Sequence, residues 1–130
     1  MSGPITALYA GLAALLLLVL SVNVIRLRWR YRTGLGDGGH PELARAQRVQ
    51  GNFVEYAPMV LVLMFLVERA GFSPWVVHAL GIMLVLGRAA HAWGLQQSDG
   101  PSLGRAAGMA LTFTAMSAGA LLALYSYVVS

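Results

Sequence analysis

The sequence predicts an all-α integral membrane protein, an up-and-down bundle of four helices that each cross the bilayer. Of its 130 residues 58% are hydrophobic and only 11% are charged, and the mean hydropathy is +0.67. Soluble domains carry roughly 25% charged residues, and disordered chains need low hydrophobicity and high charge. Several apolar runs lie along the chain, and each is close in length to the ~20 residues with which a helix spans a bilayer. We therefore expect a single domain over residues 1–130.

The first helix is predicted over about residues 5–25, where the stretch 12–20 is wholly apolar. Its positive charges follow the apolar run, whereas a cleaved signal peptide carries them before it, so we expect a retained helix. Residues 26–32 then alternate arginine with Leu27, Trp29 and Tyr31. This pattern can bind nucleic acid, but at the end of a membrane helix it is typical of a basic anchor with interfacial aromatics. We expect no nucleic-acid partner.

Three further helices are predicted over about residues 41–70, 74–95 and 102–127, after a glycine-rich loop at 34–40. Proline suits the first turn of a helix, and Pro41 and Pro74 mark two of these starts. A turn at residues 98–101 separates the last two helices. Small residues along the fourth helix, such as Gly104 and Gly108, predict close packing on a neighbouring helix and favour oligomerisation.

The arginines predict the orientation of the bundle. They cluster in the first connection and flank the third, whereas the second holds only Arg69, offset by Glu68, and the tails hold none. By the positive-inside rule the first and third connections are cytoplasmic, and both termini lie outside. The polar ends of helices two, three and four then share the cytoplasmic side.

Polar residues of the second helix recur on one narrow face. Arg45, Arg48, Asn52 and Glu55 are spaced by three, four and three residues, which places them on one side of an α-helix. Ionisable groups within a membrane helix normally face a bundle interior or a wet cavity and indicate a functional site. Pro58 removes one backbone hydrogen bond just beyond Glu55.

The other two polar helix ends add more arginines than acids. Arg88 and His91 share a face of the third helix, and Arg105 begins the fourth. One interpretation is that Glu55 and these arginines form ion pairs that only hold the bundle together. The surplus of positive charge favours an anionic ligand instead, because buried charge needs a partner. Glutathione, with two carboxylates and a thiol that must ionise, fits this description. No metal site is expected, since the chain has no cysteine and His78 and His91 are too far apart along one helix to share a metal.

Two segments resemble the signatures of a known family. The segment Arg48–Pro58, RVQGNFVEYAP, resembles the helix-two signature of the MAPEG family, the membrane-associated proteins in eicosanoid and glutathione metabolism. The segment Gly87–Gly94 is similar to its helix-three signature, and the resemblance covers essentially the whole chain. It implies a homotrimer that binds glutathione between neighbouring subunits near the cytoplasmic face. The chain is most similar to the short bacterial members, which implies the bacterial inner membrane and contact with membrane lipid.

The resemblance also implies roles for individual residues. The residues that match glutathione-contacting positions are Arg48, Asn52, Glu55, Tyr56, Arg88 and His91, with Gln50 and Arg28 reaching the ligand from the adjacent subunit. Arg105 is the candidate for the helix-four arginine that stabilises the glutathione thiolate, although it lies a few residues from the family's usual place. Leu95 departs from the family pattern, because well-studied members carry a tyrosine there.

Three functions remain open from the sequence. The first is a glutathione-dependent transferase or peroxidase that acts on lipophilic small-molecule electrophiles. The second is a family member without catalysis, retained as a structural or binding protein. The third is a small proton-coupled multidrug transporter that uses Glu55, although neighbouring arginines would disfavour cation binding at that carboxylate.

Overall fold

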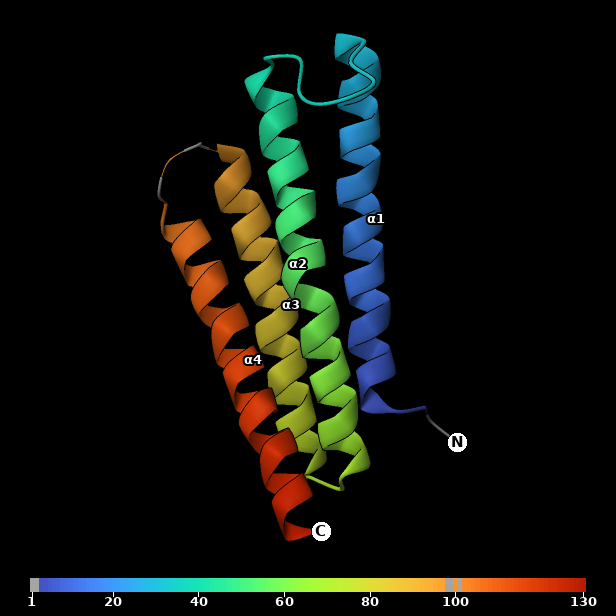
Figure 1. Ribbon diagram of the computed structural model, residues 1–130, viewed down its shortest axis with the longest axis vertical. Coiled ribbons are helices and arrows are strands. Elements are labelled where there is room, and N and C mark those ends of the chain that lie inside the picture. The colour runs from blue at the N-terminus through green and yellow to red at the C-terminus, as the bar shows by residue number, and fades with distance from the viewer. Residues whose placement is uncertain (1–2, 98–99, 101) are drawn as a thin grey trace.

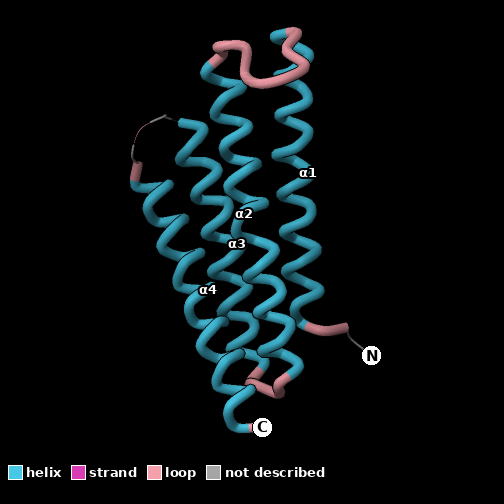
Figure 2. The backbone as a smooth tube through the Cα atoms, viewed as in Figure 1, coloured by secondary structure: helices cyan, strands magenta, loops and turns pink. Residues whose placement is uncertain are grey.

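The computed structural model describes residues 3–97, 100 and 102–130, and this part of the chain forms four helices without a strand (Figure 2). They are α1 (Ile5–Tyr31), α2 (Pro41–Arg69), α3 (Pro74–Gln97) and α4 (Leu103–Val129). Each is long and apolar enough to cross a membrane. Successive helices run in opposite directions, so both chain ends lie at the same end of the bundle (Figure 1). The predicted all-α, up-and-down membrane bundle is confirmed; most of the turn expected at 98–101 lies outside the described residues.

Helix α1 is longer than the sequence predicted. It was expected to end near Ile25, but it continues through the basic segment to Tyr31. Arginine and leucine are good helix formers, and Leu27 is buried in a small cluster with Leu43 of α2, which holds the extension against the bundle. The helix ends at Arg32, whose φ of 49° is the left-handed cap conformation.

Helices α2 and α3 form the centre of the bundle. Helix α1 packs on both, and α4 packs on both from another side, while no α1–α4 contact occurs in the described residues. Most of the core is apolar, with Phe53 and Met64 of α2, Leu84 of α3 and Ala115 of α4 buried. Helix α2 is continuous from Pro41 to Arg69 with Pro58 inside it. The outer faces of all four helices remain rich in exposed aliphatic side chains, as a bilayer environment allows.

A glycine seam joins α3 and α4. A Cβ on Gly87 would lie 2.9 Å from the carbonyl oxygen of Gly108, and one on Gly104 would lie 3.1 Å from the Cα of Gly94. Any larger residue would separate the two backbones. The close packing predicted from Gly104 and Gly108 is found between α4 and α3 of one chain. Their contribution to oligomerisation stays a prediction.

At the end of the bundle where the chain termini lie, the carboxylate of Glu68 joins α2 to the start of α1. Glu68, near the end of α2, accepts hydrogen bonds from the backbone N–H of Ile5 and, at 2.8 Å each, from the backbone N–H and hydroxyl of Thr6. An anion at a helix N-terminus satisfies unpaired N–H groups and complements the helix dipole. Tyr9 and His78 add a hydrogen bond of 2.7 Å between α1 and α3. These groups serve the packing of the bundle.

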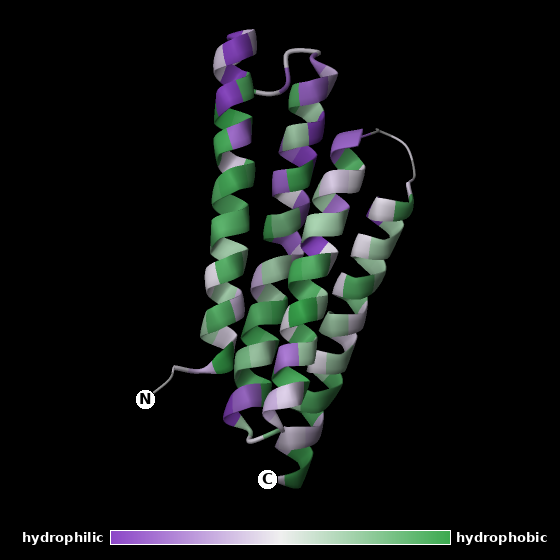
Figure 3. Cartoon of the chain, turned by 180° about the vertical axis from the view of Figure 1, so that it is seen from behind, coloured by the Kyte–Doolittle hydropathy of each residue, from purple (hydrophilic) through white to green (hydrophobic). Residues whose placement is uncertain are grey.

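The opposite end carries most of the hydrophilic residues (Figure 3). There the α1–α2 loop is tied to both helices, because Arg28 Nη1 at 3.0 Å and Gln47 Nε2 at 2.7 Å both donate to the carbonyl oxygen of Gly36. The start of α2, the end of α3 and the start of α4 meet at this end (Figure 1). The candidate site lies among them.

Candidate functional site

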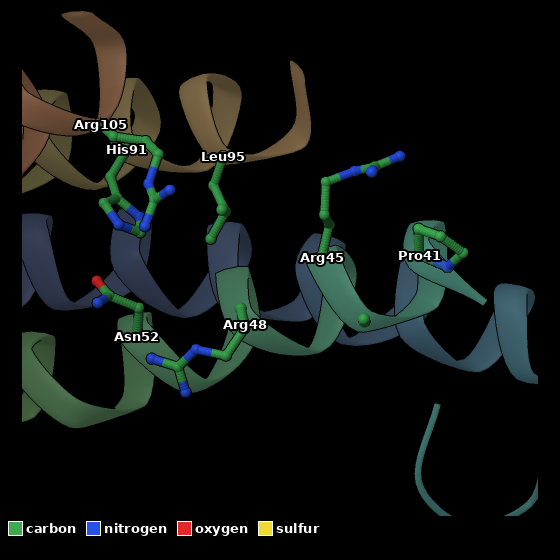
Figure 4. Close-up of a pocket in the computed structure, with 8 residues that line it drawn as sticks. Pro41, Arg45, Arg48, Asn52, His91, Leu95 and Arg105 are labelled. Carbon is green, nitrogen blue, oxygen red and sulfur yellow. The ribbon is translucent and has the colours of Figure 1, made fainter. Parts of the chain in front are cut away.

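A pocket of about 260 Å³ opens between α2, α3 and α4 at the hydrophilic end of the bundle (Figure 4). It is lined by Pro41, Ala44, Arg45, Arg48, Asn52, His91, Leu95 and Arg105. Three guanidinium groups, an amide and an imidazole thus come together from three helices. Such a lining suits a ligand with carboxylate groups, because guanidinium binds carboxylates through paired hydrogen bonds.

One face of α2 supplies three of the five polar residues that line the pocket. Arg45, Arg48 and Asn52 are three and four residues apart, so the helical repeat directs all three toward the pocket side. Glu55 continues the same face but does not line the pocket. Its carboxylate lies 3.3 Å from Arg48 Nη1, and both side chains are at least half exposed, at 59% for Arg48 and 50% for Glu55. The pair is an exposed contact of small energetic value.

Arg105 reaches the pocket from the first turn of α4. The helix is capped by Ser102, whose hydroxyl accepts the backbone N–H of Arg105 at 3.2 Å, and Arg105 Nη1 donates to the carbonyl of Gly100 at 3.1 Å. The guanidinium lies beside the ring of His91 and points toward Asn52 across the pocket (Figure 4). Arg105 therefore stands where three helices meet.

Arg88 lies behind the pocket and is only 2% exposed. Its Nε donates to the Thr112 hydroxyl at 3.0 Å, its Nη2 contacts the Met109 sulfur at 3.2 Å, and its Nη1 donates to the side-chain oxygen of Asn52. The Asn52 oxygen is therefore occupied, and the amide NH2 is left to donate to a ligand. Arg88 therefore holds the side chain of Asn52 in position for the pocket.

A second hollow of about 360 Å³ adjoins the pocket. It is lined by Asn52, His91, Ser102, Arg105, Ala106 and Met109. Asn52, His91 and Arg105 belong to both linings, so they form the boundary between the two spaces. The second hollow has a less cationic lining, because Ala106 and Met109 replace Arg45 and Arg48.

Besides Arg88, four residues that the sequence associated with the ligand lie outside the pocket lining in the single chain. Tyr56 packs under Arg88, whose guanidinium carbon is 5.8 Å from the ring centre. Gln50 donates to the Ser21 hydroxyl on α1 at 2.8 Å, and Arg28 binds loop carbonyls. Glu55, paired with Arg48, is the fourth. Contacts of Gln50 and Arg28 with a neighbouring subunit's ligand stay predictions.

Comparison with known proteins decides the family. The model of the MAPEG family matches residues 6–125. The chain belongs to the MAPEG family. It is similar to the inner membrane protein YecN of Escherichia coli strain K12, with 50% identity over 90 residues and 69% of each chain covered. It is also similar to the uncharacterized protein sll1147 of Synechocystis, with 35% identity over 95 residues, 71% of this chain and 67% of the relative.

Membership of MAPEG confirms the resemblance seen in the helix-two segment. It makes the chain a membrane protein of a family in glutathione and eicosanoid metabolism. The four apolar helices and the inner-membrane relative agree that the chain is an integral membrane protein.

Several residues that line the pocket or the adjoining hollow are absent from the predicted ligand contacts. Arg45 could be found from its helical spacing, which places it on the face of Arg48. Pro41 follows the same spacing, because it lies four residues before Arg45 on α2. Ser102 and Met109, which line the adjoining hollow, gave no such signal, because their position depends on how α4 docks on α2 and α3. Within the described part of the chain, no group of acidic or histidine side chains is placed to hold a metal ion.

Proposed function

We propose that this MAPEG member binds glutathione in the pocket and acts as a glutathione-dependent transferase or peroxidase on lipophilic electrophiles. The observation that carries the proposal is the meeting of Arg45, Arg48 and Arg105 with Asn52 and His91 in one pocket. Glutathione offers two carboxylates for the guanidinium groups and peptide groups for the Asn52 amide. Family membership supports the choice of this anion over others.

The two adjoining hollows suggest how the reactants would be arranged. The cationic pocket would hold the peptide portion through Arg45 and Arg48. The second hollow, with Ala106 and Met109 in its lining, would receive the lipophilic reactant. Arg105 borders both spaces, so a sulfur atom placed beside it would face the electrophile. Holding the thiol and the electrophile next to each other makes the reaction effectively unimolecular, which lowers its entropic barrier.

Arg105 would act on the thiol. A guanidinium beside the sulfur favours the thiolate, which is the nucleophile, over the thiol. In the transferase reaction the thiolate forms a carbon–sulfur bond while the leaving group departs with the bonding electrons. In the peroxidase reaction it attacks the outer oxygen of a hydroperoxide, breaks the O–O bond and yields an alcohol, and a second glutathione completes the disulfide and releases water.

The proposal includes a homotrimer with the site near the cytoplasmic face. The arginine distribution supports this orientation, because the pocket lies at the end rich in arginine. In a trimer, Gln50 and Arg28 would complete the pocket of the neighbouring subunit.

The test is glutathione binding by calorimetry and conjugation to a lipophilic chloronitrobenzene, both with detergent-purified protein. We expect binding at millimolar glutathione or below. Arg105→Ala should lower turnover by about 10²–10³-fold, the usual loss for one group that stabilises developing charge, with a smaller change in affinity. Arg69→Ala, at the other end of α2, is the charge-matched control and should change neither.

Each other outcome selects another function. No binding at millimolar glutathione contradicts the proposal. Binding without turnover indicates the non-catalytic alternative, which Leu95 favours because it lines the pocket with an aliphatic group. Transport of a cationic dye that is lost in Glu55→Gln and unaffected by glutathione would indicate the transporter, although Glu55 is paired with Arg48.

A further inference from the structure

A separate hollow of about 320 Å³ lies at the end of α1, outside the candidate site. It is lined by Ile25, Arg28, Trp29, Arg32, Thr33 and Gly34, which we call the α1 pocket. Ile25, Arg28 and Trp29 are spaced by three and one, so they lie on one face of the end of α1, and Arg32 is the cap residue that follows the helix. Two of them are arginines, while Ile25 and Trp29 are 55% and 80% exposed and supply an apolar wall.

In the α1 pocket, loop carbonyls hold the guanidinium of Arg28, and Arg32 lies at the helix cap. Arg28 Nη1 donates to the carbonyl oxygens of Thr33 at 3.2 Å and Gly36 at 3.0 Å, which fixes the guanidinium at the rim. Arg32 occupies the left-handed cap that ends α1. Among the described residues, neither arginine forms an ion pair. Nε and Nη2 of Arg28 remain as donors, since a guanidinium has five N–H groups.

The alternate arginines of the same segment have other partners. Arg26 donates to the side-chain oxygen of Asn23 at 2.9 Å, and Arg30 lies 3.8 Å from the carboxylate of Glu42 on α2. Neither lines the α1 pocket. The basic segment therefore has two faces, one directed at the bundle and one that borders a hollow.

We infer that the α1 pocket binds the phosphate headgroup of an anionic phospholipid, with the start of an acyl chain along Ile25 and Trp29. Two guanidinium groups match the oxygens of a phosphodiester. Exposed tryptophan at the end of a membrane helix lies at the level of lipid headgroups, which puts the phosphate within reach of Arg28 and Arg32. The volume is near the lower limit of ligand pockets, ~300–1,000 Å³, and suits a headgroup.

Within one chain, helix α1 contributes no residue to the candidate pocket or to the hollow that adjoins it. In the proposed trimer Arg28 would also reach the pocket of the neighbouring subunit, so Arg32→Gln, which leaves Arg28 in place, is the variant that separates lipid binding from glutathione binding. A lipid at the α1 pocket would fix the end of α1 and the loop that joins it to α2. The chemical class of the ligand follows from two cations beside an apolar wall at the membrane surface.

The test is native mass spectrometry of the full chain in detergent, titrated with phosphatidylglycerol or with phosphatidylcholine. We expect phosphatidylglycerol to bind more tightly. Arg28→Gln with Arg32→Gln should weaken its binding by about tenfold or more. Arg26→Gln with Arg30→Gln removes the same charge from the other face and should change binding by less than about threefold.

A second measurement covers the case in which loss of Arg28 disturbs the loop. Arg32→Gln alone leaves both loop hydrogen bonds of Arg28 intact and should still weaken lipid binding. In a Trp75→Phe, Trp93→Phe background, phosphatidylglycerol with brominated acyl chains should quench Trp29 fluorescence more than brominated phosphatidylcholine. Equal losses in both double variants would indicate diffuse surface charge and overturn the inference. Absence of a preference for the anionic lipid, or displacement of the lipid by inorganic phosphate at equal concentration, would overturn it as well.

Discussion

The close contact between α3 and α4 predicts that Gly108→Ala destabilises the bundle and disturbs the site. A Cβ at Gly108 would lie 2.6 Å from the backbone nitrogen of His91 and 2.7 Å from its Cβ. The nearest atom is the backbone carbonyl oxygen of Gly87, at 2.5 Å. Non-bonded heavy atoms pack comfortably at ~3.5 Å, so α4 must move outward by roughly 1 Å. None of these contact atoms is the end of a flexible side chain, so the backbone has to yield.

The magnitude follows from two opposing terms. Overpacking a filled interface costs about 1–3 kcal/mol, whereas alanine in place of glycine stabilises a helix interior by about 0.5–1 kcal/mol. Gly11→Ala isolates the second term, because nothing lies within 4 Å of a Cβ at Gly11 in α1. The difference in unfolding free energy between Gly108→Ala and Gly11→Ala should therefore be about 1–3 kcal/mol.

The assay is unfolding of each variant in mixed micelles of increasing dodecyl sulfate fraction, followed by far-UV circular dichroism. The midpoint should fall for Gly108→Ala relative to Gly11→Ala. Glutathione affinity should fall as well, because the backbone of His91 is the contact that moves. If Gly108→Ala is as stable as Gly11→Ala, the α3–α4 contact is looser than the structure indicates and the reasoning fails.

Two other predictions concern hydrogen bonds that hold the bundle. Thr112→Val removes the hydroxyl that accepts Arg88 Nε at 3.0 Å and should cost about 1–3 kcal/mol of unfolding free energy, because a buried donor loses its partner. Thr114→Val is the matched control and should be nearly neutral, since Thr114 is exposed and its hydroxyl bonds only within α4. Glu68→Gln weakens the cap on α1 and should lower stability by about 0.5–2 kcal/mol in the same assay, while glutathione binding at the other end stays unchanged. An unchanged midpoint for Glu68→Gln would contradict the capping role.

The sequence predicts the fold well because membrane helices leave a strong local signal. Length and hydropathy place all four helices, and Pro41 and Pro74 place two of their starts. The predicted end of α1 is too early, because a basic helix end has the same low hydropathy as a loop. In the structure the burial of Leu27 continues the helix to Tyr31.

The candidate site is less visible in the sequence because it depends on contacts between helices. Helical spacing alone places Arg45, Arg48 and Asn52 on one face. Spacing gives no information on which face of α4 meets α3, so the roles of Gly108 and Thr112 in that contact emerge only from the structure.

Arg88 shows how depth changes the role of a charge. From the sequence it counts with Arg48 and Arg105 as surplus positive charge that seeks an anion. In the structure it is almost fully buried and donates to Asn52 of α2 and Thr112 of α4. A buried cation is costly unless polar groups surround it. Here those groups come from α2 and α4, which must be aligned with α3 to supply them. Arg88 would be costly to leave without these partners, and it therefore fixes the relative positions of α2, α3 and α4. The same contacts set the spacing between Asn52 and Arg105 across the pocket.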